Sequence, residues 1–221
     1  MTVQPRPTRS ASFDRTGRRV VLFSAPIATA LVVLLHPPDP TTAGSLGTQT
    51  DLYIAIHVGL LFMLPLLAIA VWLILDGLTG TAAGLARLTL PFMLVFYAAF
   101  DALVGIGAGL MAREALAFDG PAADGAQALA ARWMEIPMPI PILGALGPLS
   151  WTLALGAAAV AHFRAGSHLL VVLGLAVAAP LFGFGHAFIT GPIAMAGLVL
   201  AAAALEFGRR PRLATMATDN G

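Results

Sequence analysis

A single carboxylate lies near the centre of one long apolar stretch of this chain. Asp101 is the only charged residue between Leu90 and Met111. An unpaired charge in the hydrocarbon of a membrane costs about 3 kcal/mol or more, so such a residue ordinarily faces the protein interior and marks a functional site. Its partners must come from polar side chains on the other apolar stretches.

Three histidines meet that requirement, because His36, His57 and His186 lie within apolar stretches or at the end of one. Imidazole and carboxylate groups are ligands of zinc, iron, copper and nickel ions, and three protein ligands with one open position make a catalytic metal centre. We therefore predict a metal site formed by His57, His186 and Asp101, with His36 at its rim. No H-E-x-x-H or other tight ligand spacing occurs, so this prediction rests on the depth of the residues in the membrane.

A b-type haem is the alternative cofactor. His57 and His186 lie at similar depths on different apolar stretches, and two such histidines can serve as axial ligands of one haem iron. In either case the cofactor-binding residues are His57 and His186, whereas the catalytic residues, and whether the protein is an enzyme at all, stay open.

Asp101 also fits a different function, because a carboxylate near the membrane midplane with histidines above it is typical of proton-coupled carriers. Tyr97 lies one turn before Asp101 on the same helix face, and Ser150 and Thr152 occur at about the same depth in another apolar stretch. These residues predict a pocket or proton relay, and hence a proton-coupled small-solute transporter or channel. If they only hydrogen-bond to Asp101 across helices, the protein is a structural or partner-binding membrane subunit without chemistry.

The composition identifies the class of protein that holds these residues. The 221-residue chain is 58% hydrophobic and only 10% charged, whereas soluble domains carry about 25% charged residues. Lipid must therefore solvate most of the chain, which predicts an all-α, polytopic transmembrane helix bundle without a separate soluble domain. The net charge of +1 argues against a nucleic-acid partner, and the lack of cysteine excludes disulfides and thiolate metal sites. The expected partners are the lipid bilayer and either another membrane protein or a second copy of this chain.

Six apolar stretches of about the length of a membrane span follow one another along the chain. Proline-rich or polar segments separate them, and basic or polar tails flank them. We predict a disordered basic tail at 1–19, a polar tail at 209–221, and spans at about 20–35, 52–75, 88–111, 140–163, 168–189 and 192–208.

The arginines predict the orientation of these six spans, because cytoplasmic loops carry an excess of positive charge. Only two of the twelve basic residues, Arg113 and Arg132, fall on the side opposite the tails. This asymmetry places both termini in the cytoplasm. The absence of lysine, together with abundant alanine and glycine, is typical of a GC-rich bacterial genome, so we expect a multi-pass protein of the bacterial cytoplasmic (inner) membrane.

With this orientation the polar residues gather in the outer half of the membrane. At 1.5 Å per residue, His57 lies about 8 Å and Asp101 about 13–15 Å below the outer boundary, with His186 about one turn below it. Glycines 105, 107 and 109 thin the third span on its way out. The sequence thus predicts a pocket that opens outward, near which Gly125–Met134 can form an amphipathic interfacial helix anchored by Trp133.

Overall fold

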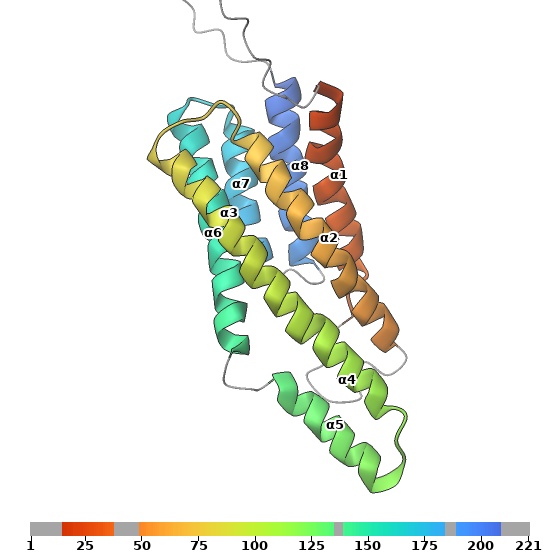
Figure 1. The fold of residues 1–221 in the computed structure, drawn as a ribbon. Coiled ribbons are helices and arrows are strands. Elements are labelled where there is room, and N and C mark those ends of the chain that lie inside the picture. The colour runs from red at the N-terminus through yellow and green to blue at the C-terminus, as the bar shows by residue number, and fades with distance from the viewer. Residues whose placement is uncertain (1–14, 38–48, 135–138, 184–188, 209–221) are drawn as a thin grey trace, which may run out of the picture.

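The computed structural model describes residues 15–37, 49–134, 139–183 and 189–208. Within these ranges every regular element is a helix (Figure 1), which confirms the predicted all-helical fold class. The elements are α1 (Arg15–Leu34), α2 (Thr50–Ile74), α3 (Thr81–Phe100), the π-helix η2 (Asp101–Gly107), α4 (Ala108–Ala115), α5 (Gly120–Met134), α6 (Ile140–Arg164), α7 (Leu169–Gly183) and α8 (Thr190–Phe207).

Five helical segments of the described chain are long and apolar enough to cross a membrane: α1, α2, the continuous segment Thr81–Ala115, α6 and α8. The sixth apolar helix, α7, has 15 residues. At 1.5 Å per residue this is about 22 Å, shorter than the roughly 30 Å of a bilayer core. The span predicted for this part of the chain, His168–Ile189, extends through residues 184–188, which lie outside the described part of the chain.

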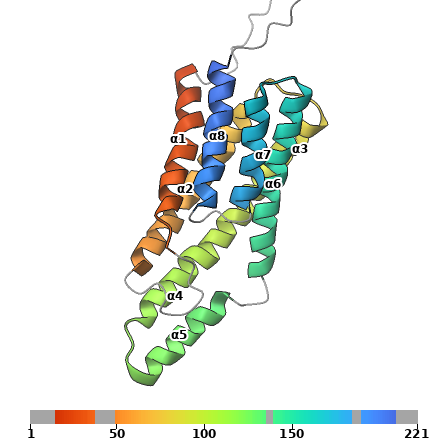
Figure 2. The same cartoon turned by 180° about the vertical axis from the view of Figure 1, so that it is seen from behind.

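These helices pack side by side in a closed ring (Figures 1 and 2). The neighbours around the ring are α1, α2, α3, α6, α7 and α8, and α8 packs back against α1. Large side chains such as Trp151, Leu64 and Phe182 are fully buried inside, whereas Phe62 and Phe163 are among the many apolar side chains exposed outside. An apolar core within an apolar outer surface suits a bundle that is solvated by lipid.

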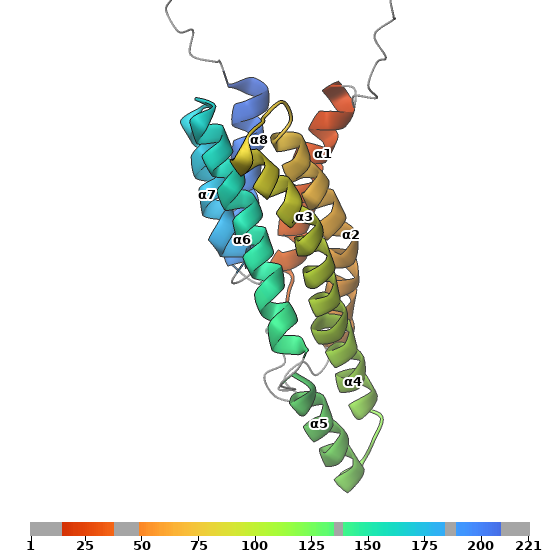
Figure 3. The same cartoon turned by 60° about the vertical axis from the view of Figure 1, so that its left-hand side comes forward.

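The third predicted span is much longer in the structure than Leu88–Met111. Helix runs without a break from Thr81 to Ala115. Arg87, which lies between two predicted spans, is part of α3, and its side chain caps the end of α2. Its Nη2 atom donates to the carbonyl oxygens of Leu75 at 2.8 Å and Leu78 at 3.0 Å. A 35-residue helix is about 52 Å long, and its far end extends past α1, α7 and α8 (Figure 3).

Helix α5 folds back beside α4 at that far end, where the two form a hairpin outside the ring (Figures 1 and 3). It begins at Gly120, five residues before the amphipathic helix expected from the sequence at Gly125–Met134. The indole of Trp133 points back to the bundle and donates to the carbonyl oxygen of Leu103 at 2.9 Å. Trp133 is therefore a tertiary contact in this structure.

Ion pairs join the first and last helices at the opposite end of the ring. Arg18 and Arg19 of α1 place their Nε atoms 2.8 Å and 3.0 Å from the two carboxylate oxygens of Glu206 in α8. Arg18 also lies 3.2 Å from a carboxylate oxygen of Asp76, which follows α2. This cluster closes the ring where the chain enters α1 and leaves α8.

Candidate functional site

Two histidines and a tyrosine form a buried cluster of rings between α1 and α2. The chain turns directly after α1, where the backbone nitrogen of His36 donates to the carbonyl oxygen of Val33 at 3.2 Å, and this turn directs His36 towards α2. The ring centroids of His36 and His57 are 4.9 Å apart, and Tyr53 lies 5.4 Å from His36 and 4.2 Å from His57. All three side chains are at least 95% buried, so His36, expected at the rim, lies inside the site.

Backbone carbonyl groups determine which nitrogen of each imidazole carries a proton. His57 Nδ1 lies 2.8 Å from the carbonyl oxygen of Tyr53, and His36 Nδ1 contacts the carbonyl oxygen of Pro37. A carbonyl oxygen can only accept, so both Nδ1 atoms donate. The two Nε2 atoms then direct lone pairs at each other across 3.3 Å, an approach that is favourable only with a proton or a metal ion between them.

The π-helix η2 supplies the wall against which this cluster packs. A Cβ atom on Gly105 would lie 2.0 Å from His57 Cδ2, so only glycine leaves room for the ring. The hydroxyl group of Tyr53 donates to the carbonyl oxygen of Val104 at 3.3 Å. π-Helical turns frequently occur at functional sites, and here one turn packs against a histidine of the neighbouring helix.

Asp101 is the first residue of η2 and lies one turn from Gly105. Its side chain is 2% exposed, and its Oδ2 atom has no hydrogen-bond partner among the described residues. No ion pair among the described residues involves Asp101. A buried carboxyl oxygen without a partner costs about 1–3 kcal/mol or more, which makes Asp101 a candidate functional residue.

The other predicted pocket residues make contacts of their own. The Tyr97 hydroxyl donates to carbonyl oxygens of α7, at 2.8 Å to Phe182 and 3.3 Å to Gly183. Thr152 donates to the carbonyl oxygen of Ala179 at 3.1 Å, and Ser150 is buried on the same helix. Tyr97 and Thr152 therefore connect α7 to α3 and α6, and they hold the end of α7 close to the level of Asp101.

A complete metal site is not present in the described residues. No group of three His, Cys, Asp or Glu side chains there is close enough to hold a metal ion. His186, predicted as the third ligand, lies outside the described residues, so its position stays a prediction. The two other histidines lie near the C-terminal end of α6, away from this cluster. His162 contacts the carbonyl oxygen of Ile74 at 3.0 Å, and His168, which follows α6, is exposed.

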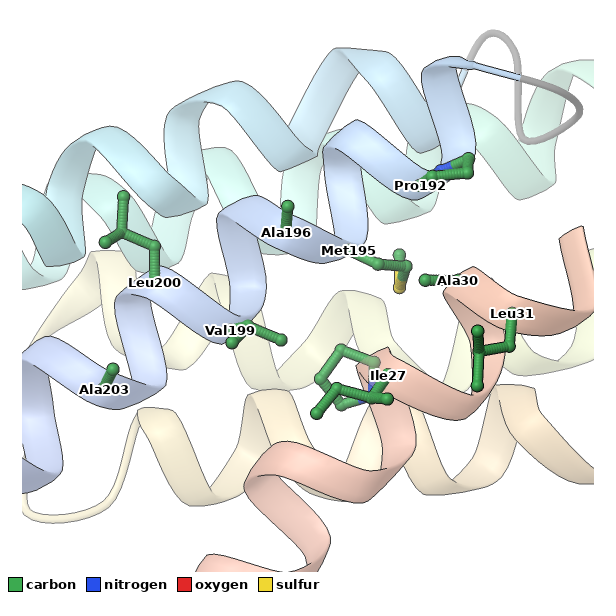
Figure 4. Close-up of a pocket in the computed structure, with 10 residues that line it drawn as sticks. Ile27, Ala30, Leu31, Pro192, Met195, Ala196, Val199, Leu200 and Ala203 are labelled. Atoms are coloured by element: carbon green, nitrogen blue, oxygen red, sulfur yellow. The ribbon is translucent and has the colours of Figure 1, made fainter. Parts of the chain in front are cut away.

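A groove on the outer side of the ring has no such chemistry. It lies between α1 and α8, has a volume of about 510 Å³, and is lined only by apolar side chains such as Pro26, Leu31 and Met195 (Figure 4). Without a polar group it can bind neither a metal ion nor a proton. The polar cluster of His36, Tyr53 and His57 is therefore the better candidate site.

No family model, curated protein or solved structure matches this chain. The geometry of the site itself is therefore the basis for inferring a function.

Proposed function

We propose that the protein binds a transition-metal ion between His36 and His57. One observation carries this proposal: both Nδ1 atoms donate to backbone carbonyl groups while both Nε2 atoms converge at 3.3 Å. Histidines that ligate metals almost always donate their second ring N–H to a carbonyl, a carboxylate or water, which fixes the tautomer and the ring orientation. In this protein both His36 and His57 have this arrangement, and their Nε2 atoms face each other.

The distance between the two Nε2 atoms supports a tetrahedral ion. Zinc–nitrogen bonds of about 2.0–2.1 Å at the tetrahedral angle separate two ligand atoms by about 3.3–3.4 Å, and the observed separation is 3.3 Å. Imidazole ligands suit zinc, copper, iron and nickel. We propose His186 as the third ligand and a water or solute as the fourth.

The geometry at His57 favours a metal ion over haem. An axial histidine presents one ring nitrogen to iron at the centre of a large planar macrocycle. In this structure the Nε2 atom of His57 faces His36 Nε2 at 3.3 Å, and Nδ1 is bonded to the backbone. Neither nitrogen has space for a porphyrin in this arrangement.

The metal content of protein purified in mild detergent and dialysed against Zn²⁺ tests the proposal. We expect about one bound ion per wild-type chain, and a loss of most bound metal in His36→Ala and His57→Ala, because each variant removes one of the two ligands. His168→Ala is the matched control, since that histidine is exposed at the other end of the bundle. Wild-type protein without metal, or full occupancy in both site variants, would contradict the proposal.

Proton-coupled transport is the second candidate function, and the unpartnered Oδ2 atom of Asp101 is the observation that favours it. It ranks second because Tyr97, Phe182 and Trp151 pack together on the side of α7, with ring centroids 5.8 Å and 4.9 Å apart. These buried rings fill the interior near Asp101. Proton flux into liposomes decides the question: transport through Asp101 predicts a flux that Asp101→Asn abolishes, and an unchanged flux removes Asp101 from the path.

We propose that all six ring helices span the bacterial cytoplasmic membrane, with both termini in the cytoplasm. The distribution of arginines supports the orientation, and the position of α7 between α6 and α8 in the ring supports its membrane location. Because the chain has no cysteine, single cysteines report topology cleanly. We expect a membrane-impermeant maleimide to label Asp124→Cys in intact cells and Thr79→Cys only after permeabilisation. The reverse pattern would invert the orientation.

A further inference from the structure

Side chains from two different elements bond to successive carbonyl groups of η2. Trp133 of α5 donates through Nε1 to Leu103 O at 2.9 Å, and Tyr53 of α2 donates through its hydroxyl to Val104 O at 3.3 Å. Insertion of side-chain donors into the backbone ladder is a known cause of local departures from α-helical geometry. The π-helical turn is thus held by one contact from inside the ring and one from the hairpin outside it.

Three alternate glycines lie against the side chains of His57, Tyr53 and Trp133. A Cβ on Gly105 would meet the His57 ring at 2.0 Å, and one on Gly109 would meet Tyr53 Cδ1 at 3.2 Å. A Cβ on Gly107 would lie 3.8 Å from Trp133 Nε1. Gly105 and Gly109 therefore face α2, whereas Gly107 faces α5. The same short segment is in contact with the candidate site on one side and with an extra-bundle helix on the other.

We propose that Trp133 is a positioning residue for the metal site, through which the docking of α5 controls that site. Leu103 and Val104 are adjacent, so a displacement of one carbonyl displaces the other. Val104 O is bonded to Tyr53, whose own carbonyl oxygen orients His57. This inference rests on the proposed function of the His36–His57 pair and identifies its regulation. A ligand or partner that moves α5 at the outer end of the molecule alters the metal site without contact with either histidine.

Trp133→Phe tests the inference because it removes the indole N–H and keeps an aromatic ring beside Gly107. Changes beyond the ligands themselves weaken metal binding by about 10–100-fold, so we expect Zn²⁺ affinity to fall at least about tenfold. With Co²⁺ in the site, the visible absorption bands should shift as the ligand geometry changes. Trp72→Phe is the matched control, since Trp72 is half-exposed and lies near the other end of α2. It should retain wild-type affinity and spectrum.

Hydrogen exchange in metal-free protein supplies a readout that does not depend on a bound ion. Trp133→Phe should accelerate exchange in residues 101–109 and 53–57 and leave α6 and α8 protected, which separates a local effect from misfolding. Wild-type affinity, spectrum and exchange in Trp133→Phe would overturn the inference, as would acceleration throughout the bundle. If wild-type protein binds no metal but the local acceleration occurs, the metal proposal fails while the link from Trp133 to His57 holds.

Discussion

At the scale of single residues, the site depends on the absence of a side chain at Gly105. His57 occupies the space where Gly105 has no side chain, and its ring is oriented by the carbonyl oxygen of Tyr53 in its own helix. Sequence-based depth places His57 and Asp101 in the same half of the membrane. It does not show that His36 reaches His57, because that contact depends on the direction of the chain after α1. Nor does it reveal the tautomers, which depend on carbonyl groups that no sequence pattern marks.

Gly105→Ala should disrupt the metal site without touching a ligand. The added methyl group would lie 2.0 Å from His57 Cδ2, so the imidazole or η2 must move. We expect Zn²⁺ affinity to fall at least about tenfold, as for other changes around metal ligands. Isothermal titration with Zn²⁺ measures the effect. Gly84→Ala is the control, because nothing lies within 4 Å of its added Cβ. Equal Zn²⁺ affinity in both variants would show that Gly105 does not determine the position of the His57 ring.

At the scale of helices, small residues set how closely neighbouring elements approach. α7 and α8 meet at Gly174 and Gly197, where a Cβ on Gly174 would lie 2.4 Å from the carbonyl oxygen of Gly197. Helix association in membranes relies on such close packing because lipid provides no hydrophobic drive between helices. The sequence predicted the helices from their apolar lengths. It could not predict the π-helix, whose carbonyl groups accept hydrogen bonds from Tyr53 and Trp133 of other elements.

Gly174→Ala should separate α7 from α8 and destabilise the bundle. Overpacking of a close contact costs about 1–3 kcal/mol, here because the new methyl group meets backbone atoms that cannot rotate away. The midpoint of thermal unfolding in detergent should therefore fall by several degrees, about 2–4 °C for each kcal/mol. Gly156→Ala is the matched control, with open space at its added Cβ. A midpoint that falls equally in both variants would point to helix properties other than this contact.

At the scale of the whole molecule, the ring is closed by charge at one end and holds the polar cluster towards the other. The composition alone predicted a helical membrane protein, because a chain so poor in charge cannot cover a soluble core. The order of helices around the ring was not predictable, because apolar stretches of similar length and composition do not indicate which helices pack against one another. The length of Thr81–Ala115 was not predicted either. Residues 81–87 fall between two predicted spans, yet they are helical, and Arg87 caps α2.

Glu206→Gln should weaken the closure between α1 and α8. Glu206 is 10% exposed and bound by both Arg18 and Arg19, so its neutral analogue leaves two arginines with a weaker acceptor. We expect a loss of about 1–2 kcal/mol, reduced from buried ion pairs because both arginines are partly solvated. Thermal unfolding should show this as a lower midpoint. Asp76→Asn, which changes a 73% exposed side chain of the same cluster, should shift the midpoint much less.

The contact between α1 and α8 has a consequence for how the protein is made. Membrane helices emerge from the ribosome in order, so His36, Tyr53, His57 and η2 are all synthesised before α6 begins at Ile140. The His36–His57 pair proposed to bind metal can therefore form from the first half of the chain, whereas closure of the ring requires Glu206. Until α8 is synthesised, α1 lacks its partner in the ring and presents this edge to lipid.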